Sequence, residues 1–357
     1  MAARIPHIGR LPAGPRDAIT DVAGVTVGHA TLDEGDTHTG VTVVRPHGGS
    51  PFMQRVPTGV AVLNGFGKSV GLLQVEELGL LETPIALTNT FAVPAVAQAQ
   101  IRQCIASHPE CGRGLPTVNP LVFECNDGFL NDIQRMAVRE ADYLAACGCA
   151  GVHFAQGAVG AGRGMSCCGL KGGIGTASRR VSIGGQAPWT VGALVLANFG
   201  LLANLVIAGH AAGPRLAEQL ALSTGNVANM PEAEKGSIIL LLATDAPLDA
   251  RQLRRLALRA GAGLARTGSV FGHGSGDIAL AFSTAYTLPL LPDQPMPAVA
   301  LLHDALLDGL FQAVADSTEQ AILHALWHAR SLKGRGGHAR PALVDLLADW
   351  PADAFAA

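Results

Sequence analysis

A glycine followed by a serine, Gly236-Ser237, stands at the start of a short apolar run that ends at Asp245. A run this short, rich in Ile and Leu and followed by Asp and Pro, predicts a strand buried on both faces. If the bond between the two residues is cut, Ser237 becomes a chain terminus carrying both a hydroxyl and an α-amine. A free α-amine, with a pKa near ~8, can act as the base for that hydroxyl. The pair therefore predicts a serine nucleophile that needs no histidine.

Two features make a cut at this bond chemically reasonable, although a glycine and a serine alone are also typical of an ordinary turn. Gly236 tolerates the twisted backbone in which a hydroxyl attacks the preceding carbonyl. The preceding segment, 210–235, is polar, contains two prolines and is expected to be exposed after its own short helix at 216–222. An exposed segment of this kind gives a new chain end room to leave.

A second group of reactive side chains lies in the run Gly-His-Gly-Ser-Gly-Asp at 272–277. Ser275 and Asp277 are two residues apart, so in an extended segment they project to the same side and could together orient an amine. His273 could belong to the same group. A turn built from small residues explains the run equally well.

Composition excludes several other classes of protein. The chain has 357 residues and a net charge of −3; 48% of its residues are hydrophobic and 4% aromatic. This length lies between one large domain and two ordinary ones. The small negative charge and scarce aromatics predict no nucleic-acid partner.

Cysteine usage predicts the compartment. The seven cysteines are odd in number and form no C-x-x-C pair. This pattern favours free thiols over a disulfide framework or a metal site. Residues 1–16 contain no apolar run of the kind found in signal peptides. We therefore expect a cytoplasmic protein without a metal.

The uncharged segment 181–214 could be mistaken for a membrane span. Asparagines and glycines at 198, 200, 204 and 209 interrupt it, and unpaired polar groups are costly in lipid. We predict instead two buried strands, 190–197 and 201–208, joined by a tight turn. No membrane partner is expected.

The glycine-dense segment 157–180 resembles a phosphate-binding loop only superficially. It contains no G-x-x-x-x-G-K-[S/T] match, and no strand and helix flank it in the order that a dinucleotide fingerprint requires. We interpret it as the wall of a pocket or as a hairpin between 164 and 182. No nucleotide or other cofactor is predicted.

Elsewhere, short strands alternate with helices. Strands are predicted at 18–29, 38–44, 59–63, 84–90, 121–125 and 278–283. Helices are predicted at 69–81, 93–105 and 130–147, from a capping box at Asp249 towards Leu264, and after a second cap at 317–320. The paired strands look antiparallel, which favours a layered αββα arrangement over a doubly wound sheet.

Several long motifs, in order and in register, resemble the L-aminopeptidase/D-esterase-amidase family, which includes the β-aminopeptidases. They are Gly236-Ser237 with the strand that follows, KGGIGTASR at 171–179, ETPIALTNT at 82–90, NDGFLND at 126–132, TVGALV at 190–195 and GSGDI at 274–278. The likeness extends from about residue 19 to residue 336, which is nearly the whole chain.

The resemblance implies an α+β fold, a four-layer αββα sandwich similar to the N-terminal-nucleophile hydrolases. It implies one catalytic domain, 1–357, that cuts itself into 1–236 and 237–357, and an oligomer of these heterodimers, expected to be a tetramer. The expected substrates are small peptides, amides or esters, with β-amino or D-amino acid derivatives among the candidates.

The resemblance also assigns roles to individual residues. Ser237 falls on the nucleophile, and Ser275 and Asp277 fall on the hydroxyl and carboxylate near its α-amine. Asn198 falls on a donor to the oxyanion, where a fixed hydrogen-bond donor is needed as charge develops. The residues expected to contact the substrate are Asn126 and Gly274.

Three departures from the family pattern, Phe66, Lys68 and Ala158, predict a different pocket specificity. Two alternatives stay open. One is an acyltransferase of the ornithine acetyltransferase type, although those enzymes use threonine where this chain has Ser237. The other is an inactive binding homologue, which the changes at Phe66 and Lys68 would allow.

Overall fold

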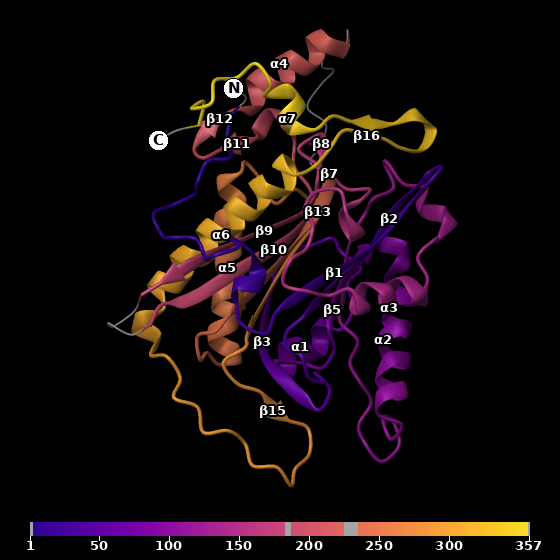
Figure 1. Ribbon diagram of the computed structural model, residues 1–357, viewed down its shortest axis with the longest axis vertical. Helices are drawn as coiled ribbons and strands as arrows, with labels where there is room; N and C mark the ends of the chain where they lie inside the picture. The colour runs from indigo at the N-terminus through magenta and orange to yellow at the C-terminus, as the bar shows by residue number, and fades with distance from the viewer. Residues whose placement is uncertain (1–2, 183–186, 225–234, 356–357) are drawn as a thin grey trace.

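The structure is a computed structural model that describes residues 3–182, 187–224 and 235–355. Two β-sheets lie face to face, and helices cover the outer face of each (Figure 1). The predicted four-layer αββα sandwich is therefore confirmed. Residues 225–234, part of the polar segment before Ser237, lie outside the described residues.

The first sheet has the strand order β1-β2-β5-β6 in the part of the chain that is described. Its strands are β1 (Thr26–Glu34), β2 (Thr37–Arg45), β5 (Ile85–Asn89) and β6 (Val122–Cys125). Its outer face is covered by α2 (Val93–Ser107) and α3 (Glu140–Gly148).

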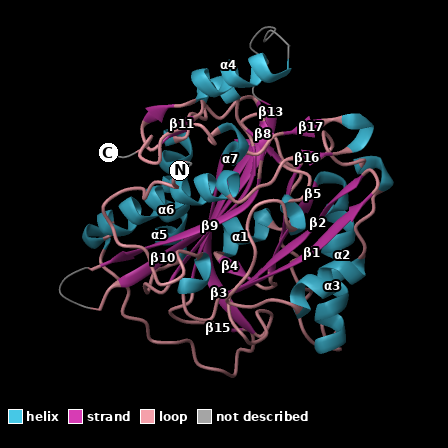
Figure 2. Cartoon of the chain, turned by 45° about the horizontal axis from the view of Figure 1, so that its top comes forward, coloured by secondary structure: helices cyan, strands magenta, loops and turns pink. Residues whose placement is uncertain are grey.

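The second sheet has the order β15-β3-β14-β13-β10-β9, and β4 pairs with β3 at one side. Its strands are β3 (Gln54–Gly65), β4 (Leu80–Leu81), β9 (Gly173–Val181), β10 (Trp189–Asn198), β13 (Lys235–Thr244), β14 (Gly274–Ser283) and β15 (Leu288–Pro289). The helices α5 (Ala250–Arg266) and α6 (Asp308–Trp327) cover its outer face (Figure 2).

Smaller elements complete the chain. The helices are α1 (Leu72–Leu78), α4 (Gly213–Thr224) and α7 (Leu343–Leu346). The short ladders pair β7 (Ser166–Cys167) with β8 (Leu170–Lys171), β11 (Val206–Ile207) with β12 (His210–Ala211), and β16 (Leu332–Lys333) with β17 (Ala339–Arg340). The N and C marks lie on the side of the molecule that carries β11 (Figures 1 and 2).

Strand β13 is buried on both faces, as its apolar run predicts. Ile238 and Leu240 point into the core that the second sheet shares with α5 and α6. Ile239 and Leu241 point into the core between the two sheets. The alternation of side chains along a strand therefore turns Ser237 towards the space between the sheets.

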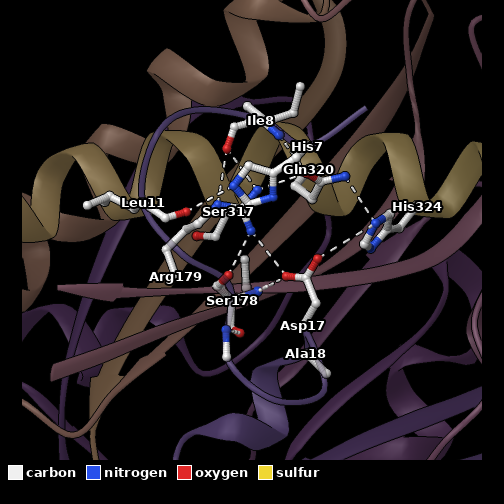
Figure 3. A network of polar contacts seen from close by, with 12 residues as sticks. His7, Ile8, Leu11, Asp17, Ala18, Ser178, Arg179, Ser317, Gln320 and His324 are labelled. Atoms are coloured by element: carbon white, nitrogen blue, oxygen red, sulfur yellow. Dashed lines mark hydrogen bonds and ion pairs between the residues drawn. The ribbon is translucent and has the colours of Figure 1, made fainter. Parts of the chain in front are cut away.

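The N-terminal segment is fixed to the second sheet and to α6 by Arg179, a fully buried residue of β9 (Figure 3). Its guanidinium donates to the carbonyl of Ile8 (3.1 and 2.9 Å), to Asp17 Oδ1 (3.1 Å) and to Gln320 Oε1 (2.8 Å). An unpaired arginine is costly to bury, and these bonds satisfy the charge of Arg179 at the end of the KGGIGTASR motif.

Several predicted elements are confirmed with small shifts at their ends. The helix that begins after Asp249 has the expected capping box: Gln252 N donates to Asp249 Oδ1 (2.7 Å), and Asp249 N donates to Gln252 Oε1 (3.1 Å). The predicted elements at 84–90, 93–105, 121–125 and 216–222 correspond to β5, α2, β6 and α4. The strand predicted at 18–29 begins later, at Thr26.

Three predictions were wrong. The hairpin of 190–197 with 201–208 does not form, because β10 pairs with the distant strands β9 and β13. The helix predicted over 130–147 begins only at Glu140, because Asn131 Nδ2 bonds Asp127 Oδ1 (2.9 Å) and holds the preceding residues in a turn. Residues 317–320 lie inside α6, where Ser317 Oγ donates back to Ala313 O (2.7 Å) instead of capping a helix.

Candidate active site

Ser237 and Asn198 lie directly opposite each other on the antiparallel strands β13 and β10. Directly paired residues point to the same face of a sheet. Leu196, two residues before Asn198, packs in the core between the sheets, so Asn198 also faces that side. The hydroxyl and the amide therefore both face the end of the inter-sheet core.

A cavity of about 700 Å³ opens at this point. The predicted site residues that line it are Asn126, Asn198, Gly236, Ser237 and Gly274. Ser237 is 6% exposed and Asn198 is 7% exposed, so both are largely buried in the cavity wall. This volume is in the usual range for small-molecule pockets.

The orientation of the Asn198 amide is fixed from both sides. Ser166 N donates to Asn198 Oδ1 (2.8 Å), and Asn198 Nδ2 donates to the carbonyl of Asn126 (3.0 Å). The amide nitrogen carries a second N–H, so one donor can hold the side chain while the other faces a ligand. Asn126 contributes here through its backbone, while its side chain accepts from Gly128 N (2.9 Å).

Ser275 and Asp277 lie beneath the cavity rather than in its wall, and both are fully buried. Ser275 Oγ donates to Asp277 Oδ1 (2.5 Å). In the parallel pairing of β13 with β14, Gly236 is opposite Ser275 and Ser237 is opposite Gly276. The backbone of Ser237 therefore runs alongside residues 275–277, and the Ser237 hydroxyl accepts from Gly276 N (3.1 Å).

Gly236 has a backbone conformation that other residues rarely adopt, with φ of +139°. A Cβ atom at this position would lie 2.1 Å from the carbonyl oxygen of Asn198. Both observations require glycine on the acyl side of the predicted cleavage bond.

Sequence reasoning missed Glu124, a carboxylate that lines the same cavity and is only 3% exposed. Lys68 N donates to Glu124 Oε1 (2.7 Å), and the Thr90 hydroxyl donates to Oε2. The signal in the sequence was a lone carboxylate inside an apolar strand, just before the NDGFLND motif.

At the rim of the cavity, two basic side chains lie over aromatic rings. Lys68 Nζ lies 4.1 Å from the centre of the Phe66 ring, and the Arg340 guanidinium lies 3.7 Å from that of Phe129. Cation–aromatic contacts of this kind hold flexible side chains in place. Phe66 and Lys68, which depart from the family pattern, therefore form part of the pocket wall.

Burial shifts several pKa values near the site. It raises the pKa of the Cys125 thiol, which lies 3.4 Å from the carbonyl of Ser237, so this thiol stays neutral. It raises the pKa of Asp127 to about 6 and lowers that of Lys171 to about 7. Among the described residues, no group of three or more His, Cys, Asp or Glu side chains is placed to hold a metal ion.

The fold and much of the sequence match characterised proteins. The chain is 39% identical over 336 residues to a β-peptidyl aminopeptidase, BapA, of Sphingosinicella xenopeptidilytica, covering 90% of this chain and 83% of that one. A solved β-aminopeptidase of Burkholderia sp. is 39% identical, with a TM-score of 0.87 and 98% of both chains covered.

A third relative shows to which fold class the structure is similar. The L-aminopeptidase D-Ala-esterase/amidase of Ochrobactrum anthropi is described as a prototype of the serine aminopeptidases and a variant of the Ntn hydrolase fold. It is 35% identical, with a TM-score of 0.85 and with 96% of this chain and 95% of that one covered. Fold and site together define a serine aminopeptidase of the N-terminal-nucleophile type. The model of peptidase family S58 matches residues 17–340, and the chain belongs to that family.

Proposed function

We propose that this protein is a self-cleaving aminopeptidase in which Ser237 is the nucleophile and its own α-amine is the base. The observation that carries the proposal is the pairing of Ser237 with Asn198 at one cavity, with Ser275 and Asp277 on the strand that pairs with Ser237 on its other side. The family match favours this function over the acyltransferase alternative.

Self-cleavage would proceed through an ester. The Ser237 oxygen attacks the Gly236 carbonyl carbon, the C–N bond breaks, and the nitrogen takes up the hydroxyl proton as it becomes an amine. Water then hydrolyses the ester, which returns the hydroxyl and leaves a carboxylate at Gly236. The chain 1–357 would thus form one catalytic domain made of 1–236 and 237–357.

Hydrolysis of a substrate would use the same atoms. The α-amine takes the proton of the Ser237 hydroxyl as its oxygen attacks the acyl carbon, and Asn198 stabilises the oxyanion. The ammonium then gives its proton to the leaving amine. Water attacks the resulting ester with the amine again as base, which releases the acid and restores the enzyme.

Glu124 would select for a free amino terminus. Its carboxylate lines the cavity, and a buried carboxylate favours a cationic partner over a neutral one. Small peptides, amides and esters with a free amine are the substrates that this wall accommodates, and the relatives suggest β-amino acid derivatives among them.

A panel of aminoacyl p-nitroanilides with α-, β- and D-amino acids, each also in N-acetylated form, tests this function. We expect hydrolysis of free-amine compounds only, and none by Ser237→Ala. Glu124→Gln should lose at least ~10-fold in kcat/KM on free-amine substrates. Equal hydrolysis of acetylated substrates would contradict the role of Glu124. Acyl transfer from an acetyl-amino acid would support the acyltransferase, and no reaction at all would support a binding homologue.

We also propose a tetramer of the heterodimers in a reducing, cytoplasmic compartment. The support for the compartment is that the seven thiols are free, including Cys104 and Cys111, whose sulfurs are 3.8 Å apart. Within the described residues no helix has the length and apolar character needed to cross a membrane. Light scattering gives the assembly mass directly, and cell fractionation gives the compartment.

A further inference from the structure

Lys171, the first residue of the KGGIGTASR motif, is fully buried, and none of the steps described above uses it. Its Nζ donates to three backbone carbonyls, those of Gly162 (3.0 Å), Met165 (2.7 Å) and Gly172 (2.8 Å). An ammonium group has three N–H donors, so each one finds an acceptor. The lysine thereby joins the Gly160–Gly162 turn to the β7–β8 hairpin.

One of these carbonyls belongs to the peptide bond between Met165 and Ser166. The N–H of the same peptide donates to Asn198 Oδ1 (2.8 Å). A peptide group is planar, so a cation that fixes its oxygen also fixes the direction of its N–H. Gly172 N supports the same oxygen from the other side of the hairpin (3.0 Å).

We propose that Lys171 is a positioning residue for catalysis: through the Met165–Ser166 peptide it holds the Asn198 amide in the orientation that stabilises the oxyanion. The inference rests on the proposed function, in which Asn198 is the oxyanion donor. Lys171 itself does not reach the substrate, because its ammonium is enclosed by carbonyls and lies outside the cavity wall.

A positioning role for Lys171 can be distinguished from a purely structural role by two measurements. A lysine that only supports the fold would lower stability, and its loss would add independently to the loss caused by a change at Asn198. A lysine that acts through Asn198 lowers kcat rather than raising KM, and it has no further effect once the Asn198 amide is gone.

The test is a double-mutant cycle of Lys171→Met and Asn198→Ala, with Lys333→Met as the matched change at an exposed lysine. Rates on an aminoacyl p-nitroanilide are taken per cleaved chain, as counted by intact mass. We expect Lys171→Met to lose ~10- to 100-fold in kcat with KM within about threefold, and the double variant to equal Asn198→Ala. Lys333→Met should match the wild type.

Two results would overturn the inference while leaving the proposed function intact: a wild-type kcat in Lys171→Met, or losses that multiply in the double variant. A wild-type kcat in Asn198→Ala would instead show that Asn198 is not the oxyanion donor of the proposed function. The positioning role of Lys171 would then fall as well. If Lys171→Met does not fold, the same cycle is run with Lys171→Gln, whose amide keeps two of the donors. A smaller loss in kcat that disappears in the Asn198→Ala background is then expected, and losses that multiply would overturn the inference.

Discussion

At the scale of single residues, the site depends on which face of a strand each side chain occupies. Ser237 and Asn198 share the face that opens into the cavity, whereas Ser275 and Asp277 lie beside the backbone of Ser237 with no exposed surface. A substrate therefore meets the hydroxyl and the amide, while the carboxylate can act only through the α-amine that cleavage would release.

The position of Asp277 predicts a specific change in the pH profile. A carboxylate close to an amine stabilises its charged form, so Asp277 should raise the pKa of the α-amine, which must be neutral to act as base. Asp277→Asn should therefore slow turnover and move the acidic limb of the kcat profile to lower pH. Profiles of both cleaved enzymes from pH 5 to 9 measure the shift, and an acidic limb that stays in place would separate Asp277 from the amine.

The sequence predicted correctly those placements that depend on strand alternation. Ser275 and Asp277, two apart in an extended run, do project together, and Ser237 does begin a strand buried on both faces. Glu124 was not predicted, because its partners, Lys68 N and the Thr90 hydroxyl, are distant in the sequence. Lys171 was not predicted, because its partners are backbone carbonyls, which no residue type in the sequence reveals. A lone charged residue within an apolar or glycine-rich segment gives no indication of which carbonyl or amide it will meet.

At the scale of elements, His29 links β1 to two neighbouring segments. One ring nitrogen bonds Thr42 Oγ1 on β2 (2.9 Å), and the other bonds the carbonyl of Ala155 (3.1 Å). Burial lowers the pKa of His29 to about 4 from an ordinary value of 6.5. At pH values between about 4 and 6.5, His29 therefore takes up a proton in the unfolded chain and stays neutral in the folded chain.

Stability should therefore fall as the pH drops from about 6.5 to about 4, and His29 should account for part of the loss. The expected contribution is at most ~3 kcal/mol. His29→Gln, which cannot be protonated, should lose less stability over this window than the wild type does. Urea unfolding at pH 7 and pH 4.5 measures the difference, with the exposed His153→Gln as control. Equal losses in His29→Gln and the wild type would contradict the expectation.

Local signals fixed some elements and failed for others. The helix after Asp249 was predicted correctly because its capping box is a contact between residues three apart. The hairpin at 198–200 was wrong because β10 finds its partners at long range, in β9 and β13. The cap predicted at Ser317 was wrong because the same hydroxyl can bond the preceding helical turn.

At the scale of the whole molecule, the two proposed pieces are interleaved in one sheet. β14 lies between β13 and β3, and β13 itself pairs with β10. The piece 1–236 would contain β3, β9 and β10. The piece 237–357 would contain most of β13 and all of β14. The apolar side chains of β13 lie in both adjoining cores, so burial would keep the pieces together after a cut.

The last prediction follows from this arrangement: the purified protein should consist of two non-covalently associated chains, 1–236 and 237–357. Ser237→Ala should remain one uncut and inactive polypeptide, because alanine has no hydroxyl to attack the Gly236 carbonyl. Gly236→Ala should also block or slow the cut, because its Cβ would collide with the Asn198 carbonyl. Ser237→Cys keeps a nucleophile and should still cleave, more slowly if the larger sulfur disturbs the geometry.

Intact mass and N-terminal sequencing of the second chain measure the cut, and a denaturing gel after gel filtration shows whether the pieces stay together. Gly48→Ala is the matched control for the glycine, since it adds a Cβ where nothing lies within 4 Å. A single full-length chain with aminopeptidase activity would refute the terminal-amine mechanism. A cut at another bond would show that Ser237 is not the terminal residue, so its α-amine could not act as the base for its own hydroxyl.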